Sequence, residues 1–402
     1  MVIEESLLEA IRAFAERERD AYLRDLAELV AIDSGTENLA GVNRVGDWFA
    51  ARFAAHGWEV DRLAADGYAD CRTATLRGRG GARALLLGHM DTVYPEGTAA
   101  ARPIAIAGDV LKGPGTADMK AGLLAAVYAL RALEEIGFAD YASLTLFCNS
   151  DEEVGSPASR LLYRPLAEES DFALAFECAR ANGDLVSARK GGGRYRIVVR
   201  GRSAHAGVAP ETGANAIVQL ARLVDKADAL NGIQPGVTVV VGVARGGTKV
   251  NVVPDWAECE LDVRAADREG ERAVHAALHA LAGQATVPGT RVSITGRFAG
   301  GPMERTPGNA RLAELATAVG RGLGFSVQDG PMTGGRGDAN YVAAAGLPVL
   351  DGLGPIGGDD HGPDEYILVS SIAPRIALAA GVLAAACRDV ERLRALRRPP
   401  AP

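Results

Sequence analysis

The sequence lacks the features that mark membrane-spanning, fibrous and low-complexity proteins. No run of about 18 or more apolar residues occurs along the 402 residues, and there is no internal repeat and no biased segment apart from a short Pro-rich tail at 397–402. Aromatic residues are sparse, at 5%. Hydrophobic residues at 48% and charged residues at 23% are nevertheless typical of a globular chain with packed interiors. We therefore expect no membrane partner and, because of the length, two domains.

Cysteine is scarce and irregularly spaced. The five cysteines form an odd set without a CxxC pair, at 71, 148, 178, 259 and 387. This pattern argues against a disulfide framework and favours buried, reduced thiols.

The first 20 residues are acidic and amphipathic, without the basic and apolar regions of a secretory signal. The sequence therefore predicts a cytoplasmic protein.

An excess of positive charge is also lacking. Lysine and arginine number 43 against 51 acidic residues, which gives a net charge of −8. Proteins that bind nucleic acids or anionic membranes usually present a basic face. The sequence therefore predicts no nucleic-acid partner and is consistent with an enzyme that acts on small molecules.

Apolar runs of strand length alternate with stretches of helical periodicity in the first 190 residues. The predicted helices cover 6–31, 42–55 and 118–133, and the predicted strands cover 58–63, 84–87, 143–149 and 172–176. Such alternation is typical of an α/β fold with helices on both faces of a mostly parallel sheet.

The pattern changes near residue 190 and returns near residue 301. Between them we predict strands over 195–201, 237–243, 257–263 and 291–295, and helices over 215–230 and 268–282. We therefore expect a catalytic domain over 1–190 and 301–402, interrupted by an inserted α+β domain over 191–300. A last helix is predicted over 370–386.

Two residues that can bind metals follow the predicted strand over 84–87. His89 and Asp91, in "LLLGHMDTV", are two positions apart and share a face if the chain is extended. Imidazole is a good ligand for zinc or cobalt, and a nearby carboxylate can fix the tautomer of the ring. The alternative is a turn histidine beside a capping aspartate.

Acidic residues mark the next two candidate positions. Asp118 stands at a predicted helix start in "GPGTADMKAG", where a capping role is the favoured explanation if this residue is taken alone. Asp151, Glu152 and Glu153 follow the strand over 143–149, and three adjacent carboxylates repel one another unless a cation binds them. One could then bind metal while its neighbour serves as a general base. A solvated acidic loop is the alternative.

Two further candidates are Glu177, which closes the strand over 172–176, and His361, in the glycine-rich "GPIGGDDHGPDEY". A flexible turn is the alternative at His361. Taken together, the five positions all follow strands or lie in the loops beyond them, where open α/β sheets build their sites. The other histidines over helical patterns, His56, His275 and His279, are expected at the surface.

The motifs "HMDTV", "GPGTADMKAG", "SDEEVGS", "ECAR", "GRSAHAG" and a late "HGPDE", in this order, resemble those of the M20 family of metallopeptidases. Within that family, the chain is most similar to the glutamate carboxypeptidase and aminoacylase branch. The resemblance extends from about residue 26 to 386.

The resemblance implies two zinc ions per chain, with cobalt or manganese as substitutes. His89 and Glu177 would bind one ion, Glu153 and His361 the other, and Asp118 would bridge them. Glu152 would be the general base, and Asp91 would orient His89. The resemblance also implies a cis peptide bond between Asp118 and Met119.

The inserted domain resembles the family's lid, which often forms a homodimer. His205, in "GRSAHAG", would stabilise the oxyanion, in its own site or in that of a partner subunit. Asn251 and Arg264 would bind substrate, and a guanidinium suits a carboxylate clamp. Gly335 and Gly337, in "TGGRGDANY", would let the backbone approach the ligand.

These observations predict a di-zinc hydrolase that cleaves an amide or peptide bond next to a free carboxylate, as a glutamate carboxypeptidase does. An N-acyl amino acid deacylase and a dipeptidase are alternatives, because one or two pocket contacts decide specificity. A metal-dependent binding protein without catalysis is the alternative from another class. Loss of the general base would mark such a protein, and Glu152 is present.

Overall fold

The structure is a computed structural model that describes residues 4–400. Within this range the chain forms two compact units. The first contains the residues up to Ala188, Arg305–Pro331 and those from Gly337 onward. The second contains Arg189–Glu304 and Met332–Arg336.

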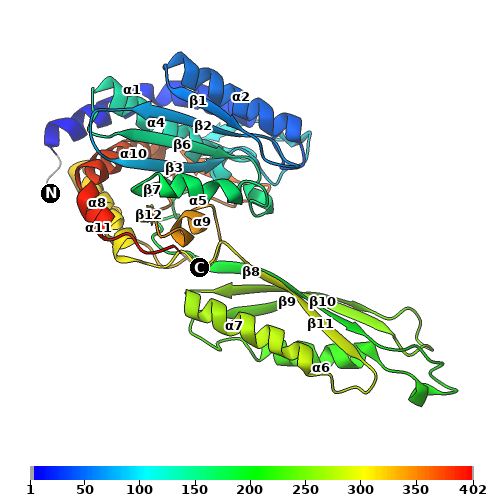
Figure 1. Cartoon of the computed structure of the whole chain (residues 1–402). Coiled ribbons are helices and arrows are strands. Elements are labelled where there is room, and N and C mark those ends of the chain that lie inside the picture. Colours follow the sequence, from blue (N-terminus) through cyan, green and yellow to red (C-terminus); the bar gives the residue numbers. More distant parts are fainter. Residues whose placement is uncertain (1–3, 401–402) are drawn as a thin grey trace. The chain divides into compact units, whose positions relative to one another are not determined.

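The first unit contains a central sheet with helices packed around it (Figure 1). Its helices are α1 (Glu5–Val30), α2 (Leu39–Ala55), α3 (Thr98–Ala101), η1 (Thr116–Lys120), α4 (Ala121–Glu135), η2 (Glu152–Val154), α5 (Arg160–Glu168), α8 (Pro307–Gly322), α9 (Ala339–Ala344), α10 (Val369–Arg388) and α11 (Val390–Ala395). Its strands are β1 (Glu59–Leu63), β2 (Cys71–Arg77), β3 (Arg83–His89), β4 (Ala105–Ala107), β5 (Val110–Lys112), β6 (Ser143–Asn149), β7 (Phe172–Ala175), β12 (Val349–Leu350), β13 (Gly357–Gly358) and β14 (Tyr366–Leu368).

The central sheet has the order β1-β2-β6-β3-β7-β12. β3 runs parallel to β6 and β7, and β12 runs parallel to β7, whereas β1 and β2 are antiparallel to their neighbours. The sheet is therefore mostly parallel, and the predicted α/β fold is confirmed. A smaller antiparallel sheet, β13-β14-β5-β4, joins segments that lie far apart in the sequence.

Helices cover both faces of the central sheet. On one face α4 and α10 pack on β3, and α1 packs on α4 and α10, around buried residues such as Leu86 and Leu123. On the other face Phe147 of β6 meets Tyr163 of α5, whose ring stacks on Tyr341 of α9 at 5.2 Å. Because both faces are covered, the strands read as continuous apolar runs rather than as alternating ones.

One helix differs from its prediction at a functionally important point. The helix predicted from Asp118 begins at Ala121 instead, after the short η1 segment. Asp118 and Met119 have non-helical dihedral angles there, and Lys120, not Asp118, occupies the N-cap of α4. The capping alternative for Asp118 is therefore excluded, and the predicted cis peptide bond between Asp118 and Met119 is confirmed.

The second unit is one antiparallel sheet with helices on one face (Figure 1). Its elements are β8 (Gly191–Arg200), η3 (Pro210–Thr212), α6 (Ala216–Asp228), β9 (Thr238–Gly246), β10 (Trp256–Ala265), α7 (Arg268–Ala280), η4 (Leu281–Gly283) and β11 (Arg291–Ala299). The strand order is β11-β8-β10-β9. Helices α6 and α7 pack on the sheet, and the core between them includes Ile197, Leu261 and Leu223.

Two histidines of α7 are not surface residues as predicted. His275 and His279 are half-buried, and their rings lie 4.4 Å apart. The hydroxyl of Tyr195 contacts Nδ1 of His275 at 2.7 Å, and Nε2 of His279 is buried without a hydrogen-bond partner. The helical pattern placed them on α7 but did not reveal that this face of the helix covers β8. His56 is exposed, as expected.

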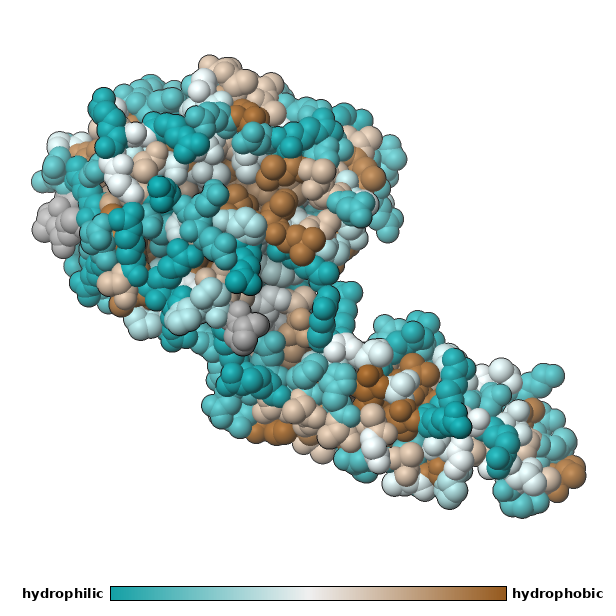
Figure 2. Space-filling model, viewed as in Figure 1, coloured by the Kyte–Doolittle hydropathy of each residue, from teal (hydrophilic) through white to brown (hydrophobic). Residues whose placement is uncertain are grey.

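Helix α10 is long and apolar enough, by composition alone, to cross a membrane. Its 18-residue window has a mean hydropathy of 1.6, but 83% of that window is buried inside the fold. A buried position between α1, α4 and α8 is that of a core helix. On the face seen in Figure 2, both units are mainly hydrophilic, with hydrophobic residues in small groups.

Candidate metal centre

The parallel strands of the central sheet bring the predicted site residues together. β3 ends at His89, β6 is followed by Glu152 and Glu153, and β7 is followed by Glu177. β3 pairs with both β6 and β7 in parallel register, so the carboxyl ends of the three strands lie side by side. Polar side chains that follow these strands therefore meet at one edge of the sheet.

His89 is buried among acidic side chains. Its side chain is 1% exposed, and its Nε2 lies 2.8 Å from Oδ1 of Asp118 and 3.8 Å from Oε1 of Glu177. Its Nδ1 lies 3.0 Å from the carbonyl oxygen of Asp91 and 3.4 Å from Oδ1 of that residue. With Nδ1 donating to Asp91, Nε2 is the nitrogen that is able to bind a metal.

Asp118 touches both histidines of the site. Its Oδ1 faces His89, and its Oδ2 lies 3.1 Å from Nε2 of His361. His361 also lies 3.2 Å from Oε2 of Glu153. The other carboxylate oxygen of Glu153, Oε1, is buried and has no hydrogen-bond partner.

Asp91 connects His89 to the turn that carries the two glutamates. Its carboxylate is fully buried and accepts hydrogen bonds from the backbone N–H groups of Glu152 and Glu153, at 3.2 and 3.1 Å. The hydroxyl of Thr36 donates a third hydrogen bond, at 2.8 Å. One carboxylate therefore fixes both the imidazole and the acidic turn.

His361 lies in a loop with unusual backbone geometry. It has a φ of 65°, and Asp359 has a φ of 56°, both in the left-handed region that residues with side chains rarely adopt. Tyr94 fastens this loop, since its hydroxyl oxygen lies 2.8 Å from the carbonyl oxygen of Gly362 and 2.7 Å from Oε2 of Glu365, the two acceptors available to its one proton. Strained residues of this kind cluster at functional sites.

Two important acids were not predicted from the sequence. Glu365 is 2% exposed and accepts hydrogen bonds from the backbone N–H groups of Gly115, Ala117 and Asp118, at 2.7, 2.7 and 2.9 Å. Asp338 accepts from the side chains of Asn149 and Ser156, at 2.9 and 2.7 Å, on either side of the acidic turn. The "HGPDE" motif gave a signal for Glu365, and Asp338 lies in the "TGGRGDANY" motif, of which only the glycines were interpreted.

The acids of the site have strongly shifted pKa values. Burial raises the pKa of the Glu152 carboxyl well above its usual range. Burial also raises the pKa of Glu153 to about 7, although the hydrogen bond with His361 acts in the opposite direction. Burial acts the same way on Asp118, but its hydrogen bonds with His361 and His89 and the charges of these histidines together outweigh burial and hold its pKa well below the ordinary value.

The histidines shift in the direction that favours a positive charge. Hydrogen bonds to Asp118 and then to Glu153 raise the pKa of His361 to about 10. Burial disfavours the charged form of His89, but its hydrogen bonds to Asp118 and Asp91 raise its pKa well above the usual value. The site as a whole therefore attracts cationic partners.

The residues fit divalent metal ions. Ligand atoms of His89, Asp118 and Glu153 all lie within 4.8 Å of one another. Imidazole and carboxylate donors are those that zinc, cobalt and manganese prefer. The partnerless, buried Oε1 of Glu153 would gain a partner from an ion. Bound cations would also offset the mutual repulsion of buried acids that outnumber the histidines.

Four of the predicted site residues, His205 and three predicted to bind substrate, belong to the second unit. His205 and Asn251 are exposed on adjacent segments, since N–H of Ala206 donates to the carbonyl of Asn251 at 3.0 Å. Arg264 donates two hydrogen bonds to its neighbour Asp262, at 2.7 and 2.8 Å. The carbonyl of Gly335 accepts from Arg189 at 3.3 Å.

Gly337 is the one predicted glycine that belongs to the first unit. Its N–H donates to Oδ1 of Asn340 at 3.1 Å, directly before α9. The structure therefore brings together the five predicted metal ligands with Asp91 and the turn of Glu152. The role of each residue stays a prediction at this point.

The known families and proteins that this chain resembles include peptidases and a desuccinylase. Residues 85–385 match the description "Peptidase family M20/M25/M40". The chain is 32% identical over 373 residues to carboxypeptidase G2 of Pseudomonas sp. (strain RS-16), covering 92% of this chain and 90% of the relative. It is 28% identical to a succinyl-diaminopimelate desuccinylase of Stenotrophomonas maltophilia (strain R551-3), covering 88% and 95%.

Solved structures share the fold. Aminopeptidase PepT from Bacillus cereus ATCC 10987 superposes with a TM-score of 0.75 at 24% identity, covering 91% of this chain and 98% of that one. The M20 family metallo-carboxypeptidase Sso-CP2 from Sulfolobus solfataricus superposes with a TM-score of 0.75 at 15% identity, covering 91% and 99%. At these identities the likeness concerns the architecture.

Proposed function

The chain belongs to peptidase family M20/M25/M40 and is a hydrolase of that family, and from this premise we propose that it is a two-metal carboxypeptidase. Its substrate is a peptide or related amide whose scissile bond lies next to a free carboxylate. The observation that carries the proposal is the position of Asp118, whose two carboxylate oxygens face His89 and His361 separately.

Two zinc ions per chain are the metals that we propose, with cobalt or manganese as functional substitutes. His89 and Glu177 would hold one ion, and Glu153 and His361 the other, with Asp118 shared between them. The proposal is supported by the contacts of 3.8 Å within the first pair and 3.2 Å within the second. When bound, the metal ions would supply Lewis-acid polarisation and make water more acidic.

Glu152 acts as the general base in this proposal. Its carboxylate takes a proton from the attacking water and passes it to the nitrogen of the leaving amine. Its raised pKa suits a group that must both accept and release a proton near neutral pH. Asp91 positions it through the hydrogen bond to its backbone N–H, and Asp338 fastens the far end of the same turn through Ser156.

The second unit supplies substrate contacts in this proposal. We assign the lid and dimerisation domain to residues 191–300 and the catalytic domain to 1–190 and 301–402. His205 donates to the oxyanion, in its own subunit or in the partner of a homodimer, and Asn251 and Arg264 bind the free carboxylate. Gly335 and Gly337 leave room for the ligand backbone. A cytoplasmic location completes the proposal.

A C-terminal glutamate is the substrate end that we favour, because the motifs of the chain resemble those of the glutamate carboxypeptidase branch. That the chain is 32% identical to a carboxypeptidase over 92% of its length supports this choice. An N-acyl amino acid or N-acyl diamino acid is the second candidate. It is favoured by the desuccinylases that align over 88% of this chain. Both reactions hydrolyse an amide next to a carboxylate and need the same metal centre.

A substrate panel tests the proposal. The purified protein would be assayed on peptides with C-terminal glutamate, on dipeptides and on N-acyl amino acids, before and after treatment with a chelator. We expect turnover that the chelator abolishes and zinc or cobalt restores. Turnover that survives complete removal of metal would overturn the metal mechanism. Two bound ions without turnover on any substrate would support the non-catalytic binding protein instead.

A further inference from the structure

The sheet of the second unit has a bare face that is rich in arginine. Helices α6 and α7 cover the other face, toward which Tyr195, Ile197 and Val199 of β8 point. The intervening residues of β8 and their cross-strand neighbours therefore point outward. Six of these outward side chains are Arg194, Arg196, Arg200, Arg264, Arg291 and Arg297. This concentration contrasts with the net charge of −8 of the whole chain.

Only two of the six arginines are neutralised by acids. Arg196 pairs with Glu258, and Arg264 pairs with Asp262. The other four form no ion pair with any part of the chain between residues 4 and 400. Glu260 is the one outward acid of β10 that forms no ion pair there. The face therefore keeps an excess of unpaired positive charge.

The unpaired arginines face one another across the strands. Arg194 of β8 is directly opposite Arg297 of β11, and Arg200 is directly opposite Arg291. The Cβ atoms of directly opposite residues are about 4.5–5.5 Å apart, and like charges at this distance destabilise a sheet. An anion bound between two such guanidinium groups would be attracted by both and would offset their mutual repulsion.

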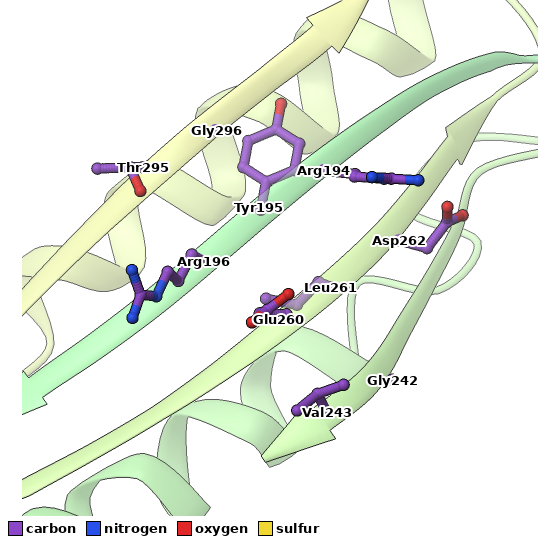
Figure 3. Close-up of a pocket in the computed structure, with 10 residues that line it drawn as sticks. All are labelled: Arg194, Tyr195, Arg196, Gly242, Val243, Glu260, Leu261, Asp262, Thr295 and Gly296. Carbon is purple, nitrogen blue, oxygen red and sulfur yellow. The ribbon is translucent and has the colours of Figure 1, made fainter. Parts of the chain in front are cut away.

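A shallow hollow of about 460 Å³ lies on the same face. Figure 3 shows Arg194 and Arg196 of β8 beside Glu260 and Asp262 of β10, with Thr295 of β11 on the other side. This volume suits a ligand of several residues rather than a single small ion. Tyr195 also lines the hollow, but its hydroxyl contacts His275 on the helix side, so its ring offers no platform for a nucleobase.

We propose that this arginine face binds an extended acidic peptide. In an extended chain, side chains on one face recur about every 6.6 Å. Arg194 and Arg200 are six positions apart on β8, so the Arg194–Arg297 and Arg200–Arg291 pairs are three such repeats apart. Acids of the peptide that are six positions apart would then lie against these two pairs. Arg264, to which the proposed hydrolysis assigns the substrate carboxylate, takes no part in this binding, which does not depend on that hydrolysis.

Fluorescence anisotropy with a labelled octaglutamate peptide tests this inference. The peptide carries a C-terminal amide, because the proposed active site requires a free carboxylate and would not bind it. The protein is used with its metals. We expect saturable binding that weakens as the salt concentration rises, and at least tenfold weaker binding to R194Q/R297Q. The double variant R222Q/R272Q, which removes the same charge from α6 and α7, should bind like the wild type.

Three outcomes would overturn the inference. One is an absence of saturable binding to the wild-type protein. Another is equal binding to R194Q/R297Q and R222Q/R272Q. The third is tighter binding of a thymidine hexanucleotide than of the acidic peptide, which would identify a nucleic-acid surface. Thermal unfolding provides a check on folding: R194Q/R297Q should unfold at a temperature no lower than that of the wild type, because the substitution removes a repulsion.

Discussion

The carboxylate of Glu365 accepts a hydrogen bond of 2.9 Å from the backbone N–H of Asp118, 247 residues earlier in the chain. The same oxygen accepts from Ala117, and the second oxygen accepts from Gly115 and Tyr94. Glu365 therefore holds the segment that presents the proposed bridging ligand without contacting a metal ligand's side chain. Its effect on the metal centre is indirect and can be measured separately.

Replacing Glu365 with Gln should weaken metal binding. An amide NH₂ would face backbone N–H groups that need an acceptor, so the segment before Asp118 would shift. Changes of this kind around metal ligands cost about 10–100-fold in metal affinity. Metal retained after dialysis against a graded series of chelator concentrations measures the loss. Asp364→Asn is the matched control, since Asp364 pairs only with the exposed Lys112, at 2.8 Å. Equal metal retention in the two variants would contradict the assigned role.

Glu152→Gln and Glu153→Gln should lose different properties, the first its catalytic rate and the second its metal. Glu152→Gln should keep both metals and lose about 10²–10⁴-fold in kcat, because only the proton transfer is removed. Glu153→Gln should lose metal if Glu153 is a ligand as proposed, a role that its buried Oε1 and its contact with His361 support. Metal content by elemental analysis and kcat on the same preparations distinguish the two. A Glu152→Gln enzyme with full turnover would refute the base assignment.

Arg264 should affect substrate binding rather than metal binding. Arg264→Ala should raise KM by about tenfold or more, the cost of one hydrogen-bonded charge pair, with metal content unchanged. Asp262→Asn should lower KM, because the bidentate pair with Asp262 competes for the same guanidinium. Steady-state kinetics on the best substrate of the panel measures both. If Asp262→Asn raised KM as much as Arg264→Ala did, Asp262 would support substrate binding rather than compete with it. The free carboxylate of the substrate would then have to be bound by a residue other than Arg264.

Stability of the second unit should fall as the pH is lowered through the range of histidine. Burial, and then the charge of His279, lower the pKa of His275 below its ordinary value. The unfolded chain therefore binds a proton at a higher pH than the folded chain does. The contribution of neutral His275 to the free energy of unfolding is fully present above about pH 6.5, the ordinary pKa of histidine. It is lost as the pH falls toward the lower pKa that His275 has in the folded chain.

Unfolding midpoints of the wild type and His275→Gln at pH 7.5 and pH 5.5 would test this prediction. The variant loses the contact with Tyr195 at both pH values, so its stability is lower throughout. The informative quantity is the difference between the two pH values, which should be smaller in His275→Gln than in the wild type. His56→Gln, at an exposed helix end, should behave like the wild type. An unchanged pH difference in His275→Gln would show that other groups are responsible.

The thiols should be unreactive in the folded protein. All five cysteines are free, four of them are buried, and Cys178 is half-buried beside Asp360. Burial raises the pKa of Cys71 to about 12 and that of Cys259 to about 11. A thiol reagent at pH 8 should therefore label the native protein slowly and the unfolded protein at five positions. Fast labelling of one native thiol would indicate local opening around it.

The sequence was sufficient for elements with strong periodicity and for acids at strand ends. The predicted strand over 143–149 is β6 residue for residue, and the site residues meet because β3, β6 and β7 are parallel neighbours. Strands of two or three residues, such as β13 and β14, have no period to detect. They form only because Gly357 pairs with Ile367 and Leu368 pairs with Val110, within the fold.

Supporting residues were harder to predict than ligands. A metal ligand has a characteristic side chain in a characteristic motif, whereas Glu365 acts on backbone N–H groups, which every residue but proline possesses. Asp338 likewise binds two side chains whose proximity is decided by the tertiary fold. The start of α4 was misplaced by three residues because the non-helical geometry at Asp118 and Met119 is not encoded in helical periodicity.

Asp118 and His361 lie 243 residues apart in the sequence, yet their side chains are 3.1 Å apart. The whole of the second unit and part of the first are synthesised between them. On the ribosome, the nascent chain can gain a partial metal site early but can complete it only when nearly all of the protein has emerged. Uptake of the proposed metal ions would therefore be a late event in the biosynthesis of this protein, and a prematurely terminated chain would be unable to acquire both of them.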